Sequence, residues 1–464
     1  MNQLLYLTVD LFLYDLQDGL GSTLSTTDEG RRRFWQRIYG EVGEEKLAAL
    51  QEVENTFSNH IELLGAQGGQ RYQKLSDEIN GYYYPVKLGD TYALQIDYSG
   101  RLNDPDWDQL SLREKLQQAK ETVLEYTHQI RGDLGENWLL WGQLTDANQE
   151  AEAIAQDCYR ALQITENPNW QRDRKGKGIF QGATLFEIER LDDTPDGVNR
   201  TMHAIICLFP HEQSKSEIQQ TINQLYKNLI HLLHYRNKIL WVYEQSRQLK
   251  IQLRTTSQRV EKIVNSLTQH IETSQLNLKQ LQEDLATALT IFHYYETNLV
   301  YLREQMATIT INTNNYKARI EQLKNLDPDN DFNFLCHFSE FAADQYIRTI
   351  KTEDEAFRAG SKPLENFIKT VEGIIDIEKA KNDRTFNRTV AIASVGISTA
   401  SLAASTFGGQ SEKIIQIWRP VPANQPTPAL NLWLSFGLAF FLSVAIGLSG
   451  AFLTWLFLGK SGRN

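Results

Sequence analysis

The sequence predicts an α+β (α/β) domain, followed by long antiparallel coiled-coil-like helices, a stalk helix and a C-terminal hairpin of two membrane-spanning helices. Three observations support this fold class. Short apolar runs separated by turn residues fill residues 1–210, no glycine or proline lies between Pro210 and Pro328, and residues 430–458 contain no charge and no proline. These patterns are typical of a mixed domain, of very long helices and of a membrane span, respectively.

Composition narrows the class of protein. The 464-residue chain has a formal net charge of −11, so we expect no direct binding to a nucleic-acid duplex, which would favour a basic surface. Its three cysteines, Cys158, Cys207 and Cys336, lie far apart in sequence. They give no disulfide framework and no zinc spacing, and they fit a reducing cytoplasm. No catalytic motif such as GxSxG or HExxH occurs, so the sequence does not indicate an enzyme.

The first 210 residues are predicted to form a cytoplasmic α/β or α+β domain, because strand-like and helix-like patterns alternate there. Residues 1–10 lack the basic start of a secretion signal and are expected to begin this domain as a strand. The expected strands cover residues 4–13, 82–96, 178–190 and 201–209, and the expected helices cover residues 31–64, 111–131 and 148–162.

Residues 211–325 are predicted to form long paired helices. An apolar 3–4 alternation runs from Val260 to Leu323 and is interrupted by only two polar residues. An earlier helix over about residues 214–255 is its antiparallel partner if the chain turns at residues 255–257. A single uninterrupted rod is the alternative.

Residues 326–360 are expected to hold a turn and a short helix, and Gly360 to Pro363 then predict a helix stop and a fresh start. No further proline occurs between Pro363 and Phe407. We therefore expect one helix of about 45 residues. Its first part, residues 361–388, forms the stalk, and its second part is the first membrane span.

Two segments are predicted to cross a bilayer. Residues 430–458 form an uncharged run of about 29 residues, which is long enough to cross a hydrocarbon core of about 30 Å. Trp433 and Trp455 lie near its ends, where indole rings prefer the headgroup layer. Residues 389–407 are also uncharged but rich in small and hydroxyl residues, so this span needs shielding by other helices.

The first span carries a stripe of hydroxyl groups along one helical face, which continues toward the cytoplasm through an asparagine. A polar stripe on a lipid-shielded helix predicts a wet, pore-lining surface. A dry packing seam of small residues is the alternative. The predicted lining consists of Asn387, Ser394, Ser398, Ser401 and Ser405.

Basic residues flank the hairpin on one side of the membrane. Lys381, Arg384 and Arg388 precede the first span as a predicted cytoplasmic basic ring, and the basic tail 459–464 follows the second span. The positive-inside rule therefore places both termini in the cytoplasm and the loop 408–429 outside. We expect a multi-pass protein of the bacterial inner membrane, with the lipid bilayer as its partner.

One basic segment of the soluble domain is a candidate site for a small anionic ligand. It contains Arg172, Arg174, Lys175 and Lys177, interleaved with glycines. The segment lacks the GxxxxGK[ST] frame of a phosphate loop, and a solvated loop is the alternative.

Two further groups have the residue types of metal ligands. Asp327, Asp329 and Asp331 imitate the first three ligands of a calcium loop, but the required Gly and Glu are absent, and a helix-terminating turn is the alternative. His231 and His234 are spaced i, i+3, which would let them share a metal. Since no acidic or thiol partner follows one turn away, we expect a polar helix face there.

The order of these parts resembles the CorA family of divalent-cation channels across most of the chain, and the resemblance is sharpest from residue 382 onward. At the end of the first span, Gly408, Gly409 and Gln410 stand where that family has Gly-Met-Asn. The resemblance implies a homopentamer around a central pore, with those three residues and Glu412 at the outer mouth. It also implies Mg²⁺ or another divalent cation as the permeant or regulatory ion.

Three functions therefore follow as hypotheses. The first is a CorA-like oligomeric channel or transporter, for cations, gated by its cytoplasmic domain. The second is a membrane effector that a nucleotide messenger activates, as in divergent relatives found beside type III CRISPR systems. The third is a non-conducting membrane scaffold that recruits partners through its long helices.

Overall fold

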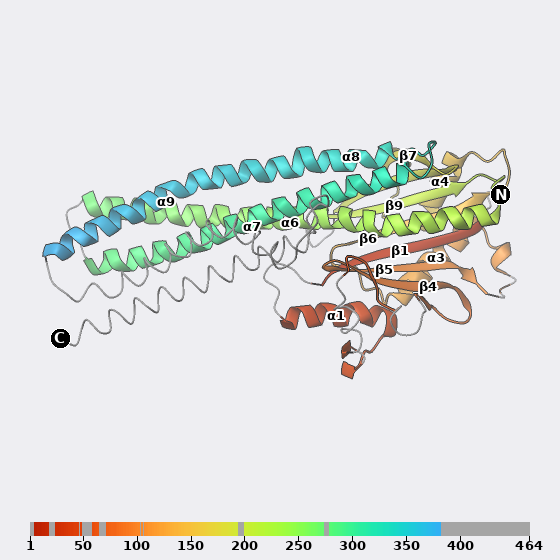
Figure 1. The fold of residues 1–464 in the computed structure, drawn as a ribbon, viewed down its shortest axis with the longest axis horizontal. Coiled ribbons are helices and arrows are strands. Elements are labelled where there is room, and N and C mark those ends of the chain that lie inside the picture. Colours follow the sequence, from red (N-terminus) through yellow and green to blue (C-terminus); the bar gives the residue numbers. More distant parts are fainter. Residues whose placement is uncertain are drawn as a thin grey trace, which may run out of the picture. The chain divides into compact units, whose positions relative to one another are not determined.

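A computed structural model describes residues 4–381 except 18–23, 46, 49–57, 65–70, 103, 105, 194–198 and 273–277. The described residues form a mixed sheet with helices, and three very long helices (Figure 1), so the predicted α+β class is confirmed. They divide into two compact units. Unit 1 comprises Met1–Gln248 and Leu302–Thr352, and unit 2 comprises Leu249–Tyr301 and Glu353–Asn464.

The described residues of unit 1 form a sheet of nine strands in the order β2-β4-β5-β1-β6-β9-β8-β7, with β3 paired to β4. Every neighbouring pair is antiparallel except β6 and β9, which run parallel. The strands are β1 (Leu4–Leu16), β2 (Ile61–Glu62), β3 (Gln73–Lys74), β4 (Ile79–Leu88), β5 (Thr91–Arg101), β6 (Gly135–Leu144), β7 (Arg174–Phe180), β8 (Ala183–Asp193) and β9 (Asn199–Phe209).

The helices differ widely in length, from one turn to 58 residues. Between α8 and α9 the chain forms a π-helical turn, a feature that often marks a functional or strained position. The helices are α1 (Leu24–Tyr39), η2 (Trp107–Gln109), α3 (Leu112–Tyr126), α4 (Ala151–Leu162), α5 (Trp170–Asp173), α6 (Lys215–Glu272), α7 (Leu278–Lys324), α8 (Asn333–Phe341), the π-helical η3 (Ala342–Ile347) and α9 (Arg348–Lys381).

Two of the expected strands are in fact hairpins. The run predicted at residues 82–96 is β4 and β5, and the run predicted at 178–190 is β7 and β8. Gln181 and Gly182 join the second pair with φ of 47° and +84°, as a tight hairpin turn requires. The strand β6 was not predicted, and α1 ends at Tyr39 rather than reaching residue 64.

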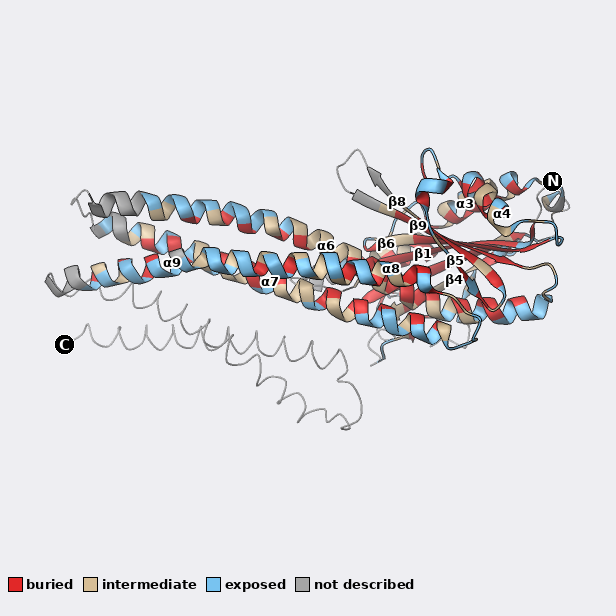
Figure 2. Cartoon of the chain, turned by 90° about the horizontal axis from the view of Figure 1, so that it is seen from above, coloured by how far each residue is buried: buried red, intermediate tan, exposed pale blue. Residues whose placement is uncertain are grey.

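The sheet is buried on both faces (Figure 2). One face packs against α3 and α4 through an apolar core that includes Leu116, Val123 and Ile154. The other face packs against α6, α7 and α8, with Leu229, Tyr316 and Leu335 among the buried side chains. A sheet covered on both faces explains why β1 reads as a nearly continuous apolar run.

α6 and α7 are antiparallel, but the predicted turn at residues 255–257 is wrong. α6 continues to Glu272, and within it the Thr255 and Thr256 hydroxyls donate to the carbonyls of Ile251 and Gln252 at 2.9 and 2.8 Å. Hydroxyls that bond back by one turn are tolerated inside a helix, so a Thr-Thr-Ser sequence does not end it. The alternative of one uninterrupted rod is wrong as well, because a new helix, α7, begins at Leu278.

The predicted helix stop at Gly360–Pro363 is also wrong, because α9 is helical throughout from Arg348 to Lys381. The Ser361 hydroxyl donates to the carbonyl of Arg358 at 3.0 Å, within the helix. In unit 2, the apolar face of α9 packs with α6 and α7, and this packing outweighs the local preference of Gly and Pro to end a helix. The cluster consists of Val260, Leu285, Ala288, Leu289, Phe367, Ile368, Val371 and Ile375.

Among residues 4–381 as described, no helix combines the length and the apolar character that crossing a bilayer requires. The predicted spans at 389–407 and 430–458, with the loop between them and the basic tail, lie outside the described residues.

Candidate functional site

The basic segment predicted as an anion site folds as one helical turn followed by a strand rather than as a loop, and its four cationic residues are exposed to solvent. Arg172 lies in α5, and Arg174, Lys175 and Lys177 lie in β7, at the edge of the sheet. The side chain of Asn169 caps the helical turn by accepting from the Arg172 N–H at 3.1 Å. The segment is therefore held by backbone structure on both sides.

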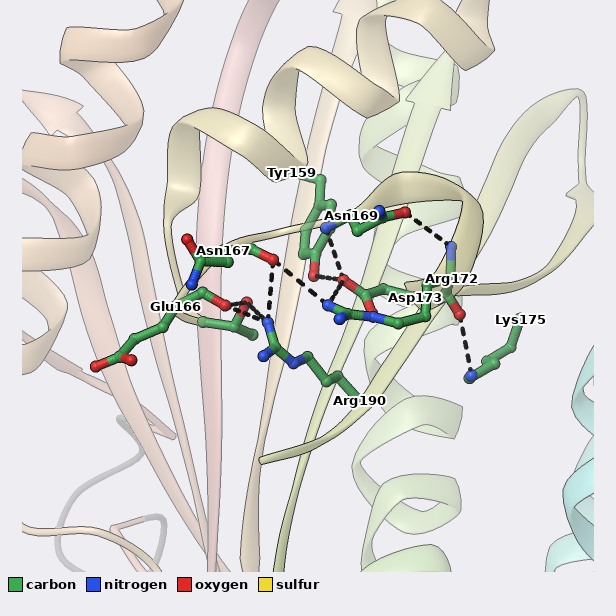
Figure 3. A network of polar contacts seen from close by, with 9 residues as sticks. Tyr159, Glu166, Asn167, Asn169, Arg172, Asp173, Lys175 and Arg190 are labelled. Carbon is green, nitrogen blue, oxygen red and sulfur yellow. Dashed lines mark hydrogen bonds and ion pairs between the residues drawn. The ribbon is translucent and has the colours of Figure 1, made fainter. Parts of the chain in front are cut away.

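Arg172 and its neighbours form a closed polar network (Figure 3). Arg172 Nε donates to Asp173 Oδ1 at 2.6 Å, and Tyr159 Oη and the Asn169 N–H donate to Asp173 Oδ2 at 2.7 and 2.8 Å. Burial opposes the ionisation of Asp173, but these hydrogen bonds outweigh it and lower its pKa to about 2. Lys175 Nζ donates to the Arg172 carbonyl at 3.3 Å.

The other two cations of the segment also have partners within the protein. Arg174 NH1 pairs with Glu152 Oε1 at 2.6 Å. Lys177 Nζ lies 5.6 Å from the centre of the Phe186 ring, within the range of a cation–π contact. An anionic ligand would have to compete with these contacts, so the geometry does not favour an anion site here.

The two glycines of the segment, Gly176 and Gly178, are explained by packing. A Cβ at Gly176 would lie 2.2 Å from Phe334 Cβ, and a Cβ at Gly178 would lie 2.1 Å from the carbonyl oxygen of Asp331. Two backbone hydrogen bonds, of 3.0 and 2.8 Å, join Ile179 and Asp331 in both directions. The glycines thus let α8 and the turn before it approach β7.

The acidic triad predicted as a weak metal site forms that turn. Asp327 Oδ1 accepts from the Asp329 N–H at 2.9 Å, and Asp331 Oδ1 accepts from the Asn333 N–H at 2.9 Å. Local bonds of this kind are typical of Asx turns. Within the part of the chain that the structure describes, no group of three or more His, Cys, Asp or Glu side chains could hold a metal ion.

The two histidines of α6 have separate partners rather than a shared one. His234 Nε2 lies 3.0 Å from Thr91 Oγ1, and His231 Nε2 lies 3.1 Å from His60 Nδ1. Burial lowers the pKa of His231 and of His234 to about 3, so both are neutral at pH 7. The predicted polar helix face is wrong for His234, which is buried where α6 packs on the sheet.

A pair of buried aspartates lies on the sheet face that α6 covers, and the sequence analysis did not identify it. Asp10 in β1 and Asp97 in β5 are opposite each other, and they are 0% and 6% exposed. The Tyr226 hydroxyl of α6 lies 2.7 Å from Asp10 Oδ2 and 3.2 Å from Asp97 Oδ2. Gln95 Nε2 donates to Asp10 Oδ1 at 2.8 Å, and Trp141 Nε1 donates to the Tyr226 oxygen at 2.8 Å.

Burial makes ionisation of these aspartates unfavourable. It raises the pKa of Asp10 well above the usual value, and the charge of Asp97 raises it further. Burial also raises the pKa of Asp97 to about 7. Two carboxyls this close titrate as a pair rather than singly. The signal in the sequence was an aspartate inside an apolar strand, since a polar residue at a buried position needs a partner.

A second buried polar cluster lies further along α6. Arg236 is 1% exposed, pairs with Glu189 (NH2 to Oε1, 2.9 Å) and has its guanidinium carbon 4.8 Å from the centre of the Phe338 ring. His203 Nε2 lies 3.1 Å from Glu187 Oε1. Burial raises the pKa of Glu187 to about 7 and lowers that of His203 well below its usual value. The docking of α6 on the sheet therefore depends on several buried titratable groups.

Two surface hollows of unit 1 are separate from these clusters. One, of about 520 Å³, is lined by Arg33, Asp133 and Trp241 among others. The other, of about 530 Å³, lies beside α3, over Leu11 and Trp138 of the sheet. Neither is lined by the aspartate pair or by the basic segment, so neither connects solvent to those groups.

Of the residues predicted in the membrane region, Lys381 is the last residue of α9. Arg384, Arg388 and the predicted lining and outer-mouth residues lie outside the described residues. The structure thus brings together the basic segment and the turn at 327–331, and it adds the Asp10–Asp97 pair. Comparison of this protein with protein-family models, with curated proteins and with solved structures gives no match.

Proposed function

We propose that this protein is a CorA-like oligomeric membrane channel, for cations, whose cytoplasmic domain controls a pore formed by copies of residues 389–407. One observation carries the proposal. α9 runs without interruption to Lys381, and the uncharged, serine-striped segment begins at residue 389, close behind it in the sequence. A long helix followed so closely in the sequence by an uncharged segment is suited to connect a soluble domain to a bilayer.

The described residues support the proposal at the level of architecture. A mixed sheet domain comes first, the long antiparallel helices α6 and α7 follow, and α9 comes last. This is the order of parts expected from the resemblance to the CorA family. α6, α7 and α9 each contribute residues to both units, so a rearrangement in unit 1 has three covalent routes along the chain to unit 2.

In the proposed pore, the hydroxyls of Ser394, Ser398, Ser401 and Ser405 replace part of an ion's hydration shell or pass a hydrated ion. The backbone and amide groups of residues 408–410 form the outer entrance. The resemblance suggests Mg²⁺ or another divalent cation as the permeant or regulatory ion, while Gly408, Gly409 and Gln410 replace the Gly-Met-Asn signature that forms the selective mouth in that family. A pentamer is the proposed assembly.

Ion flux into proteoliposomes tests the proposal. Proteoliposomes that contain the purified chain should take up divalent cations. The double variant Ser398→Leu, Ser401→Leu should lower this flux about tenfold or more, because an increase of about 1.4 kcal/mol in the barrier to ion passage slows it by that factor. Thr399→Leu is the matched control, because it removes a hydroxyl from another face of the same helix and should leave flux nearly unchanged.

The remaining outcomes separate the rival functions. Flux that starts only when a nucleotide messenger is added would favour the ligand-activated effector. Absence of flux under both conditions, with a partner protein that co-purifies through residues 214–325, would favour the scaffold. Equal flux in the double variant and the control would overturn the proposed lining.

A further inference from the structure

We propose that Asp10 and Asp97, bridged by Tyr226, form a proton-binding site in which the two carboxyls share one proton at neutral pH, and that this proton holds α6 on the sheet. The site lies wholly in unit 1, so it is independent of the proposed pore. Its ligand is the proton itself.

The described residues around the pair offer it no compensating positive charge. The titratable groups that face it are Tyr82 of β4 and Tyr226 of α6, and neither is a cation. Among the residues that the structure describes, no Lys, Arg or His forms an ion pair with Asp10 or Asp97. Charge on both carboxyls at once would therefore leave a buried, unbalanced charge of −2, which is strongly unfavourable.

Counting donors gives the same result. Both oxygens of Asp10 accept a hydrogen bond, one from Gln95 and one from Tyr226. A phenol has a single O–H, so while Tyr226 donates to Asp10 it has no hydrogen left for Asp97 Oδ2, although that oxygen lies 3.2 Å away. If both carboxyls were ionised, this oxygen–oxygen contact would contain no hydrogen.

A proton on Asp97 Oδ2 completes the network. Asp97 then donates to the Tyr226 oxygen, which accepts from Trp141 Nε1 as well, and Tyr226 donates to Asp10. The phenol oxygen has two lone pairs, so both acceptances are allowed. Every polar group that meets at Tyr226 then has a partner, and the arrangement needs one proton.

Loss of this proton should weaken the contact between α6 and the sheet. Tyr226 is the α6 residue that bonds to the pair, and its hydroxyl could then satisfy only one of two ionised carboxylates. Hydration of the second carboxylate would require water to enter beneath α6. The position of α6 on β1 and β5 is therefore controlled by pH.

Infrared spectroscopy of the full-length protein tests the proposal, because a protonated carboxyl has a carbonyl stretch that an ionised one lacks. Labelling aspartate with ¹³C at the side-chain carboxyl separates aspartate bands from glutamate bands, including that of Glu187. We expect an aspartate-derived band at neutral pH. It should persist as the pH rises above about 7 and disappear only at higher pH, because the pKa of Asp97 is raised to about 7 and that of Asp10 lies well above its usual value. A folded wild-type protein with no such band would overturn the proposal.

Variants assign the band to the pair. The double variant Asp10→Asn, Asp97→Asn should abolish the band, because burial raises the pKa of each aspartate and either one alone could stay protonated. Asp90→Asn should not change the band, because Asp90 is ionised in its pair with Lys238. Tyr226→Phe, which keeps the ring, removes the donor to the ionised form and should move the loss of the band upward by about 1 to 2 pH units. A band that is unchanged in both the double variant and Tyr226→Phe belongs to another aspartate, and the proposal fails.

Discussion

Replacing Gly178 with alanine tests whether the basic segment exists for packing or for a ligand. A Cβ at this position would lie 2.1 Å from the Asp331 carbonyl oxygen and 2.4 Å from Phe334 Cε1. Both distances are far below a van der Waals contact, and the first involves backbone, which cannot rotate away. β7 and the turn before α8 must therefore separate.

The cost follows from the contacts that would be lost. The two backbone hydrogen bonds between Ile179 and Asp331 contribute about 1 kcal/mol each. Overpacking against the Phe334 ring adds about 1–3 kcal/mol. The total loss of stability is therefore about 3–5 kcal/mol. It affects β7, the turn before α8 and α8 itself first.

Amide hydrogen exchange measures this cost locally, which matters because a chain of two units need not unfold in one step. In Gly178→Ala, the amides of Ile179 and Asp331 should exchange about a hundredfold faster or more. Gly43→Ala is the control, because no atom lies within 4 Å of the added Cβ there, and its effect should stay within about 0.5 kcal/mol. Unchanged protection in Gly178→Ala would refute the packing explanation.

Three further predictions concern charge and helix propensity. Arg37→Ala should destabilise unit 1 by about 3–5 kcal/mol in denaturant titrations, because Arg37 and Asp15 are a fully buried ion pair, whereas Arg33→Ala, at a half-exposed pair, should cost less than about 1 kcal/mol. Gly373→Ala should stabilise α9 by about 0.5–1 kcal/mol, since nothing lies within 4 Å of the new Cβ, and a lower melting temperature would contradict this. The folded-state pKa of Asp173 is about 2, below its usual 3.8. The ionised carboxylate therefore stabilises the folded protein above about pH 4, and this stabilisation is lost as the pH falls toward 2. The stability difference between wild type and Asp173→Asn should therefore be largest at neutral pH and disappear near pH 2.

The buried polar groups along α6 have a consequence for unit 1 as a whole. Tyr226 bonds to β1 and β5, and Arg236 pairs with Glu189 of β8. His234 and Lys238 contact Thr91 and Asp90, where β5 begins. A helix held only by apolar side chains can slide or rotate at small cost, whereas these directional contacts fix its register.

Local patterns in the sequence determined the kinds of elements. Long helices were predicted from the absence of Gly and Pro between residues 210 and 328 and from the apolar alternation. α7 indeed buries Leu299, Ile309 and Tyr316, which belong to that alternation. Ser111 with Glu114 forms the capping box that begins α3, where a helix was expected. Such signals can be read from sequence because the interacting residues are only a few positions apart.

Tertiary structure alone decided which residues meet and where helices end. Tyr226 bonds to Asp10 across 216 positions in the sequence, and the order of the strands brings Asp97 to the same place. The stop expected at Gly360 failed because packing of α9 against its neighbours outweighs a local preference of about 1 kcal/mol for Gly and about 3 kcal/mol for Pro. Contacts between residues far apart in the sequence depend on chain topology and burial. They produce no periodic pattern of residue types from which they could be predicted.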